Sequence, residues 1–212
     1  INFDSTGDKL ASVGNAPDFL LTVWDWRAER IVLHTKAFGQ EVFNVSFSPF
    51  FDGSLLTSGT GHIRFWKMAN TFTGLKLKGD IGKFGKIELS DIHAYAEFPD
   101  GKVLTGTNRG SLLLWDGNFI KMELICKEGK ACHDAEIRVV KLISNNGKQS
   151  IVTAAHDGYV RWWDFNQIDQ AELGYDETTY EIEITQEVFL GINVKIISML
   201  QSRDHWIVQD SA

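Results

Sequence analysis

The stretch LLTVWD at residues 20–25 is the most informative part of the sequence, because three related stretches follow it along the chain. The related stretches are HIRFWK at residues 62–67, SLLLWD at 111–116 and YVRWWD at 159–164. Their repeat tryptophans are Trp24, Trp66, Trp115 and Trp163, at spacings of 42, 49 and 48 residues. The residues one and three before each tryptophan are apolar, and this alternation with a period of two is typical of β-strands.

Each tryptophan strand has predicted partners on both sides. A preceding strand is predicted at residues 10–14, 55–59, 103–107 and 151–155. A first strand is predicted at 42–48, 92–98 and 137–143, and an outer strand at 31–35, 75–78, 120–126 and 182–190. Gly61, Gly110 and Gly158 lie in tight turns before three of the tryptophan strands, where glycine accepts the positive φ of a hairpin loop. The sequence therefore predicts four-stranded antiparallel units.

Four-stranded units that end in Trp-Asp resemble the blades of WD-repeat propellers. The predicted fold class is all-β: a WD-repeat β-propeller with four-stranded antiparallel blades, of which residues 1–212 form a partial ring of about four and a half blades. We expect blades at roughly 1–35, 40–80, 88–126 and 133–190, and the start of a fifth at 192–212. The chain begins with Ile1 and supplies only two strands of that fifth blade, so we expect it to be part of a longer protein.

The resemblance also implies a structural set that fixes one blade against the next through side-chain hydrogen bonds. In the fourth unit its members are His133, Thr153, Asp157 and Trp163. Units two and three have Thr60 and Arg109 where the aspartate should stand, and unit two has Lys67 after its tryptophan. Looser blade ends are expected there.

Charge and composition exclude several classes of protein. The formal net charge is −7, whereas general nucleic-acid binders need clustered lysine and arginine, so we expect no nucleic-acid partner. No run of 18 apolar residues exists, and we expect no membrane partner. Five lysines against one aspartate at residues 67–86, and eight acidic residues without a base at 162–194, are either solvated segments or oppositely charged docking faces. Two cysteines do not make a secreted disulfide framework, which favours a reducing cytoplasmic compartment.

Reactive side chains do not form an obvious catalytic or metal site. Cys126, Cys132 and His133 give the spacing C-x5-C-H, but a zinc site needs a second ligand pair at a matching distance. A catalytic cysteine with His133 as its base is conceivable, yet adjacent residues on a strand point to opposite faces. A structural role is favoured for all three residues. We expect that the protein is not an enzyme and that it binds no metal and no cofactor.

Loops between the second and third strands of each unit are the candidate partner-binding rim. The residues named for this rim are Asn15, Pro17, Asp18, Phe19, Arg109 and His156. Residues 15–19 lengthen the first of these loops beyond its siblings. Phe50 and Phe51 occupy a turn between first and second strands, and form a candidate opposite-face patch if exposed; packing under an adjacent blade is the alternative. Trp26 is expected in the core by its alternation with Trp24.

Stretches that lie partly outside the generic repeat resemble a family of ciliary WD-repeat proteins. They are residues 11–26 (ASVGNAPDFLLTVWDW), 57–85 (TSGTGHIRFWKMANTFTGLKLKGDIGKFG) and 99–117 (PDGKVLTGTNRGSLLLWDG). The resemblance implies a cytoskeletal scaffold of the ciliary or flagellar axoneme that tethers or positions an inner-arm dynein motor and so regulates ciliary beating. The implied partners are a sister WD-repeat ciliary protein, inner-arm dynein and a nearby doublet microtubule.

Two other classes of function stay open on sequence alone. A general cytosolic WD-repeat adaptor would use the same units to gather partners in another multiprotein complex. A propeller enzyme would need acid, base or metal groups that converge from several blades. Three unlike residues on different blades, Asp18, Arg109 and His156, support that alternative poorly.

Overall fold

The computed structural model describes residues 1–145, 147–202 and 205–211. They fall into two compact units, each considered by itself below. The first contains Ile1–Ile92, Pro99–Gly101 and Gly117–Phe119. The second contains His93–Phe98, Lys102–Asp116 and the described residues from Ile120 onward.

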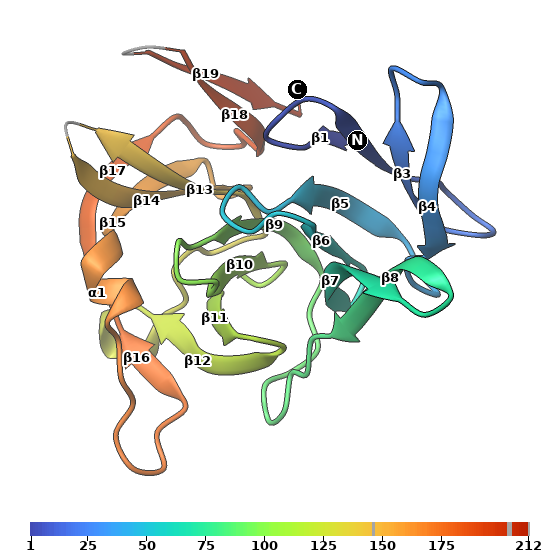
Figure 1. The fold of residues 1–212 in the computed structure, drawn as a ribbon. Coiled ribbons are helices and arrows are strands. Elements are labelled where there is room, and N and C mark those ends of the chain that lie inside the picture. Colours follow the sequence, from blue (N-terminus) through green and yellow to red (C-terminus); the bar gives the residue numbers. More distant parts are fainter. Residues whose placement is uncertain (146, 203–204, 212) are drawn as a thin grey trace. The chain divides into compact units, whose positions relative to one another are not determined.

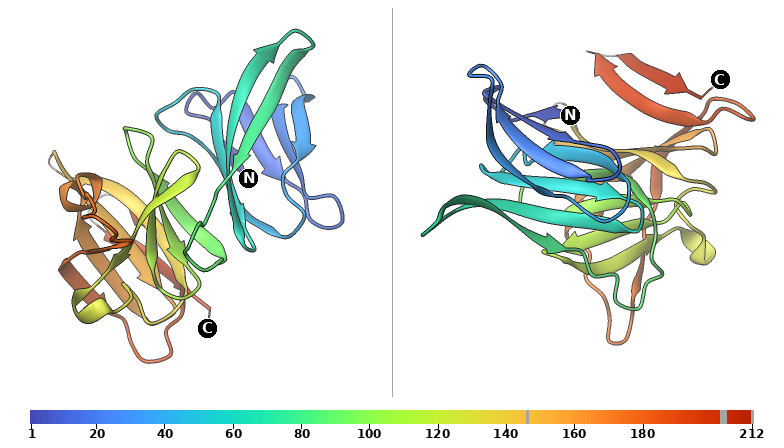
Figure 2. Two further views of the ribbon diagram at one scale, coloured as in Figure 1. Left: turned by 90° about the horizontal axis from the view of Figure 1, so that it is seen from below. Right: turned by 90° about the vertical axis from the view of Figure 1, so that its right-hand side faces the viewer.

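The first unit holds two four-stranded sheets, in each of which the strands lie side by side in chain order (Figure 1). Sheet one consists of β1 (Asn2–Phe3), β2 (Lys9–Val13), β3 (Leu20–Asp25) and β4 (Arg30–Lys36). Sheet two consists of β5 (Val42–Phe47), β6 (Ser54–Gly59), β7 (His62–Thr71) and β8 (Gly74–Ile81). All neighbours in both sheets are antiparallel. The β7–β8 hairpin is the longest and extends beyond the rest of its sheet (Figure 2).

The second unit holds two further sheets and a hairpin. Sheet three consists of β9 (Ile92–Glu97), β10 (Val103–Thr107), β11 (Leu112–Asp116) and β12 (Phe119–Ile125), with β16 (Thr179–Glu181) added in parallel to the edge of β12. Sheet four consists of β13 (Ile137–Asn145), β14 (Lys148–Ala155), β15 (Tyr159–Asp164) and β17 (Ile184–Phe189). The hairpin pairs β18 (Ile196–Ser202) with β19 (His205–Asp210).

Apolar side chains lie between successive sheets within each unit, because one sheet cannot bury both of its faces. Between sheets one and two the core includes Leu21, Val23, Phe47, Leu55 and Trp66. Between sheets three and four it includes Leu112, Leu114, Ile137, Ile151 and Trp163. A third cluster packs the β18–β19 hairpin on sheet four through Val139, Val152, Val160, Ile196 and Met199.

The predicted strands therefore all exist, with ends that differ by a few residues. The all-β class and the four-stranded antiparallel sheets are confirmed. The short helices η1 (Lys127–Gly129) and α1 (Phe165–Asp169) and the strand β16 were not predicted. Helix α1 begins where the Asp164 carboxylate accepts a hydrogen bond from the backbone N–H of Gln167, an N-cap that the sequence Asp164-x-x-Gln167 could have suggested.

Trp26 corrects a sequence-based expectation. It was expected in the core, yet its side chain is 42% exposed. The ring packs edge-on against Phe3, the Arg27 guanidinium lies over it, and its Nε1 donates to the backbone oxygen of Gly7. Residues 26–29 turn toward β4, so the alternation set by β3 does not continue through Trp26.

Candidate functional site

The four residues named for the fourth unit lie together at one end of sheet four. The Nδ1 atom of His133 is 3.0 Å from Oδ2 of Asp157, and its Nε2 atom is 2.8 Å from Oγ1 of Thr153. The Nε1 atom of Trp163 is 2.9 Å from the same Thr153 oxygen. His133, Thr153 and Trp163 are completely buried. A continuous chain of side-chain hydrogen bonds thus joins the loop before β13 to β14 and β15.

Donor and acceptor rules fix the protonation of this chain. The indole nitrogen of Trp163 can only donate, so Thr153 accepts from it and uses its own hydroxyl proton toward Nε2 of His133. Nε2 is then an acceptor, and the proton of the neutral imidazole lies on Nδ1, directed at Asp157. Burial lowers the pKa of His133 below its usual range, although the hydrogen bond to Asp157 opposes this. The geometry and the pKa agree on a neutral histidine.

Asp157 also binds the backbone around it. Its carboxylate accepts from the backbone N–H of Tyr159 at 3.0 Å and from that of Asp134 at 3.1 Å. Burial alone would raise the pKa of Asp157, but these bonds and the one from His133 outweigh burial and leave the pKa below its ordinary value. The carboxylate therefore stays charged and holds the two loops together.

The same network connects sheet four to sheet three. The backbone N–H of His133 donates to the carbonyl oxygen of Gly110, in the turn between β10 and β11, at 2.9 Å. Gly110 has φ +86°, and a Cβ there would lie 1.9 Å from the carbonyl oxygen of His133. Only glycine fits this close approach, since an L side chain would meet backbone.

Sheets one, two and three each repeat the tryptophan part of this arrangement. Each repeat tryptophan donates its Nε1 proton to a hydroxyl on the neighbouring strand: Trp24 to Ser12 at 2.8 Å, Trp66 to Thr57 at 2.9 Å and Trp115 to Thr105 at 3.0 Å. In sheet two, Nδ1 of His62 contacts the carbonyl oxygen of Thr60. Its ring stacks on Phe38, with centroids 3.8 Å apart. Within the described residues, buried Nε2 of His62 and Oγ of Ser58 have no hydrogen-bond partner.

The six rim residues fall in three loops. Asn15, Pro17 and Asp18 are exposed in the β2–β3 loop, and Phe19 is partly buried with φ 46°. The backbone N–H of Phe19 donates to the carbonyl oxygen of Asn15, which closes that loop on itself. Arg109 is exposed in the β10–β11 turn, and His156 is half-buried in the β14–β15 turn. The first four residues belong to one unit and the last two to the other.

His156 belongs to a charged cluster that the sequence did not reveal. Its Nδ1 is 3.3 Å from Oε2 of Glu136, whose Oε1 lies 2.6 Å from Nε2 of His93 and 3.2 Å from Arg138. Burial lowers the pKa of His156, and the Glu136 carboxylate opposes this. These residues come from β9, β13 and the loops beside β13 and β14, so no local spacing could have announced the cluster. In the described parts of the chain, no group of three or more His, Cys, Asp or Glu side chains could hold a metal ion.

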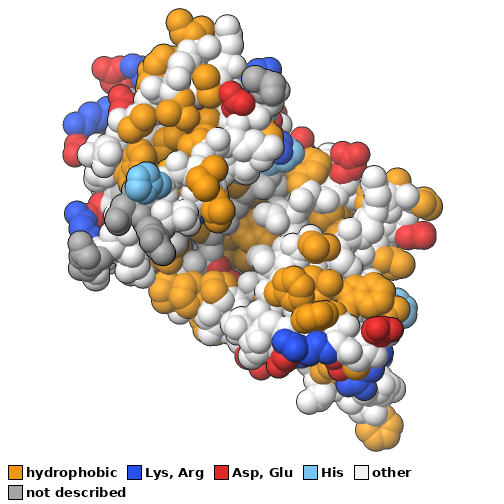
Figure 3. Space-filling model, turned by 90° about the horizontal axis from the view of Figure 1, so that it is seen from above, with side chains coloured by type: hydrophobic (Ala, Val, Ile, Leu, Met, Phe, Trp, Pro, Cys, Tyr) orange, Lys and Arg blue, Asp and Glu red, His pale blue; other side chains and the backbone are white. Residues whose placement is uncertain are grey.

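Phe50 and Phe51 stand in the β5–β6 turn and are 43% and 42% exposed. The Ser48 hydroxyl accepts from both of their backbone N–H groups, at 3.2 and 2.9 Å. The ring of Phe51 also lies beside Gly101, and this contact covers part of the ring. Hydrophobic side chains gather elsewhere too, as one face of the molecule shows (Figure 3).

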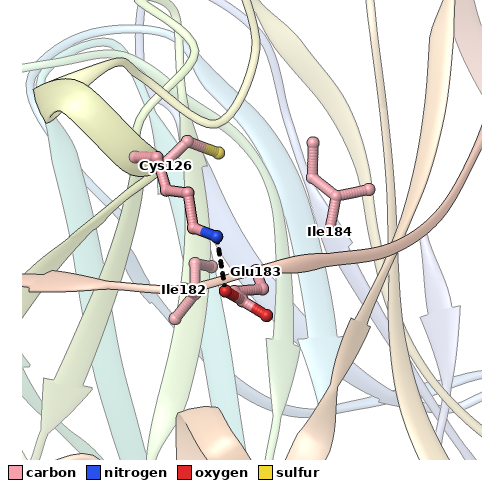
Figure 4. A pocket seen from close by; sticks show the side chains of 5 residues that line it. Cys126, Ile182, Glu183 and Ile184 are labelled. Atoms are coloured by element: carbon pink, nitrogen blue, oxygen red, sulfur yellow. Dashed lines mark ion pairs between the residues drawn. The ribbon is translucent and has the colours of Figure 1, made fainter.

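A pocket of about 240 Å³ opens beside η1 in the second unit. Cys126, Lys127, Ile182, Glu183 and Ile184 line it, and the Lys127 ammonium pairs with the Glu183 carboxylate at 2.8 Å (Figure 4). The second cysteine, Cys132, is completely buried nearby in the chain. A structural role was expected for both cysteines, and the spacing C-x5-C gave no indication of a pocket.

Comparison with known proteins gives a consistent set of relatives. The chain is 47% identical to cilia- and flagella-associated protein 44 of Mus musculus over 100% of its own length and 11% of the relative's. It is 37% identical to the protein of the same name from Trypanosoma brucei brucei, over 99% of the chain and 13% of that protein. Echinoderm microtubule-associated protein-like 4 of Xenopus laevis is 31% identical over 73% of the chain and 15% of that relative.

The first two matches span essentially the whole chain and the third spans 73% of it, but the chain covers only 11–15% of the length of each relative. No protein-family model matches the chain. None of the helices in the described parts is long and apolar enough to cross a bilayer. Identity of 37–47% along essentially the full chain, between organisms as distant as mouse and trypanosome, goes beyond what a shared repeat requires. The chain is therefore homologous, along its whole length, to one segment of cilia- and flagella-associated protein 44.

Proposed function

We propose that this chain is a non-catalytic, protein-binding segment of a scaffold in the ciliary or flagellar axoneme. The observation that carries the proposal is the full-length similarity to proteins named for their association with cilia and flagella. The relative named as microtubule-associated adds support for a cytoskeletal setting. The implied task is to tether or position an inner-arm dynein motor and so to regulate ciliary beating.

The proposed architecture is a partial WD-repeat β-propeller over residues 1–212, with blades at 1–35, 40–80, 88–126 and 133–190 and a fifth starting at 192–212. Its support is the strand order of the four-stranded sheets and the apolar clusters between successive sheets within each unit. The β18–β19 hairpin packs on sheet four as the first two strands of a next blade would. Stacked rigid sheets suit a scaffold because their loops can vary without disturbing the core.

The proposed partners are proteins: a sister WD-repeat ciliary protein, inner-arm dynein and the nearby doublet microtubule. The β2–β3 loop of the first unit and the β10–β11 and β14–β15 loops of the second are each proposed as partner-binding loops, since Asn15, Pro17, Asp18 and Arg109 are exposed there. Both ring nitrogens of His133 are engaged by Asp157 and Thr153, so this histidine is not placed to act as a general base. The chemistry of the site thus favours binding over catalysis.

The test of location uses the tagged full-length protein in motile ciliated cells, before and after detergent extraction. Retention along the axoneme, followed by chemical crosslinks to dynein heavy chains, is the expected result. A diffuse signal that extraction removes would refute the axonemal scaffold and favour a general cytosolic adaptor.

The binding rim is tested separately in the same protein. The double change Arg109→Glu and His156→Gln, in which the glutamine amide can still donate to Glu136, is expected to reduce the recovery of crosslinked partners, with little change in thermal stability. Lys148→Glu, an exposed charge reversal at the start of β14, is the matched control. Equal partner recovery from all three proteins would rule out these loops as the docking surface.

A further inference from the structure

Three lysines of the β7–β8 hairpin lie on one of its faces. Lys67 of β7 lies directly opposite Lys78 of β8, and Lys76 stands two residues before Lys78. Cross-strand partners and residues two apart along a strand point to the same face of a sheet. All three lysines are exposed. Met68 and Leu77, on the other face, pack against the core between sheets one and two, so the lysine face turns away from that core.

The fold of the first unit does not neutralise this positive charge. Lys67, Lys76 and Lys78 form no ion pair with a described residue, and Asp80 is the one acidic residue between positions 62 and 86. Like charges directly opposite each other in a sheet are destabilising, so the pairing of Lys67 with Lys78 opposes folding. The hairpin thus presents positive charge that contributes nothing to its own stability, in a chain whose net charge is −7.

The acidic segment of this chain has bases of its own. Four of the eight acidic side chains at residues 162–194 form ion pairs within the second unit, at nitrogen–oxygen distances of 2.7–3.2 Å. The pairs are Asp169–Lys102, Glu172–Lys121, Glu183–Lys127 and Glu187–Arg161. Since half of this segment is already paired, the complement of the basic hairpin is expected in another polypeptide.

Strand β8 offers an open edge beside these lysines, because it pairs only with β7 in sheet two. In an antiparallel pair, every second residue of a strand directs its backbone groups away from its partner. Ile81 is such a residue, since its carbonyl oxygen accepts from the side-chain amide of Asn118 at 3.0 Å. By the same period Leu75 and Leu77 also point outward, and their outward N–H and C=O groups bind no described residue. A further strand can therefore pair with this part of β8.

The tip of the hairpin displays an aromatic side chain. Phe72 is fully exposed at the end of the hairpin, which extends beyond the rest of its sheet (Figure 2). The turn is held by the Thr71 hydroxyl, which donates to the carbonyl oxygen of Gly74 at 2.7 Å. Aromatic rings on a rigid support are frequent anchors in protein interfaces, so the tip adds an apolar contact to the basic face.

We propose that the β7–β8 hairpin binds an extended acidic segment of a partner protein, which pairs with the outer edge of β8 as an added strand. Alternate residues of an extended peptide lie about 6.5–7 Å apart, which is also the spacing of Lys76 and Lys78. Carboxylates at every second position of the peptide therefore stand next to these two lysines. Lys67 adds positive charge from the neighbouring strand, and Phe72 contacts the partner beyond the end of β8.

Other polyanions fit this surface less well. Proteins that bind single-stranded nucleic acids stack successive bases on several aromatic side chains, whereas Phe72 is the one exposed aromatic residue of β7, β8 and their turn. Bidentate contacts to phosphate favour arginine. The one arginine of the hairpin, Arg64, donates instead to the carbonyl oxygens of Ala37 and Gly79. The open backbone edge of β8 is a feature that only a polypeptide uses.

Lysines on an edge strand also protect a sheet against edge-to-edge aggregation. This role accounts for Lys76 and Lys78 on β8. It does not account for Lys67, which lies on the interior strand β7, or for the exposed ring of Phe72. Binding of a partner accounts for all four residues.

Peptide binding to the purified full-length protein tests the proposal. The probe is a fluorescent peptide of alternating glutamate and threonine, and its anisotropy reports binding. We expect it to bind with an affinity that falls as salt is raised, and a peptide of alternating lysine and threonine not to bind. N-methylation of the threonines keeps every carboxylate but removes the backbone donors that face β8, and should weaken binding roughly tenfold or more. Equal affinity of the methylated peptide would overturn strand addition.

Two double variants locate the surface. Lys76→Glu with Lys78→Glu should weaken binding of the acidic peptide roughly tenfold or more. Lys36→Glu with Lys86→Glu changes the net charge equally at exposed positions outside the hairpin, and should keep the affinity within about twofold.

The proposal is overturned if the acidic peptide does not bind the native protein, or if both double variants weaken binding equally. It is also overturned if a single-stranded oligonucleotide or phosphatidylserine vesicles bind more tightly than the peptide and depend on the same lysines. The peptide comparison uses the unaltered protein, so it stands even where a variant fails to fold. Because no axonemal component takes part, failure here leaves the proposed function intact.

Discussion

Replacement of Asp157 by alanine is expected to loosen the end of sheet four without unfolding the rest of the chain. The change removes the acceptor of the His133 Nδ1–H, which is completely buried, and of two backbone N–H groups at Asp134 and Tyr159. Asp134 is exposed and water can replace the lost carboxylate there. His133 has no such substitute, because its other nitrogen already accepts from Thr153.

The magnitude follows from which donors stay unsatisfied. A buried donor without a partner costs about 1–3 kcal/mol, and a hydrogen bond to a charged group contributes about 1.5–3 kcal/mol. The Asp157 side chain is only 7% exposed, so little of this is screened by solvent. Relief of the buried charge offsets part of the loss, which leaves a destabilisation of about 2–4 kcal/mol. Asp157→Asn keeps the shape and one acceptor oxygen, and should lose about half as much.

Amide hydrogen exchange in the full-length protein measures this locally. The exchange of β14 and β15 amides is expected to accelerate roughly 30- to 900-fold in Asp157→Ala, at about 1.4 kcal/mol for each factor of ten. Amides of sheet two should be unchanged. Asp116→Ala, which removes an exposed carboxylate at the end of β11, is the matched control and should have no comparable effect. Exchange within a factor of three of the native protein would refute the stabilising role of Asp157.

Three further substitutions and one pH series probe the other polar contacts of the sheets. Thr57→Ala should destabilise sheet two by about 1–3 kcal/mol, since it leaves the Nε1–H of Trp66 without its acceptor. Ser58→Ala should be neutral or slightly stabilising, because the Ser58 hydroxyl is buried without a partner among the described residues. Urea unfolding of the two variants measures both effects, and equal losses of stability would contradict the prediction. Gly110→Ala should abolish the contact of the β10–β11 turn with the His133 loop, seen as loss of exchange protection there, because φ is +86° and the new Cβ meets backbone. Burial lowers the pKa of His133 in the folded state, so the unfolded chain takes up the proton at a higher pH than the folded chain does. The contribution of His133 to the free energy of unfolding should therefore be fully present above about pH 6.5 and should fall as the pH drops below it. Stability that rises between pH 7 and 5.5 would show that a charged His133 is favoured instead.

Local patterns in the sequence predict the strands, whereas the residues of the sheet-four network follow from the resemblance to WD-repeat blades. Alternation around each tryptophan reports a face that must be buried, and the turn glycines report positive φ. The network joins residue types whose hydrogen-bonding roles are complementary, and His133 and Asp157 were named because the resemblance to WD-repeat blades implies such a set. The departures at Thr60 and Arg109 are visible in the same way.

Contacts between distant segments leave no such pattern. The pairing of β16 with the edge of β12 joins residues 123–125 to 179–181, across a whole sheet of intervening chain. The approach of His93, Glu136 and His156 depends on how sheets three and four stack. The prediction that Trp26 is buried was wrong for a related reason. The turn at residues 26–29 ends the alternation of buried and exposed side chains along β3.

The segments that depart from the repeat carry the structural features that a generic propeller blade does not have. The extended β2–β3 loop carries four of the proposed rim residues, and the segment after β15 adds α1 and β16 before it reaches β17. The 240 Å³ pocket forms where the chain between β16 and β17 passes beside Cys126. Its walls therefore come from that added segment and from the start of the η1 turn. Buried strands are constrained by the packing of neighbouring sheets, whereas these segments are free to carry binding and chemistry. The repeat therefore accounts for the packed sheets, and the insertions are the places where the proposed partner contacts should be sought first.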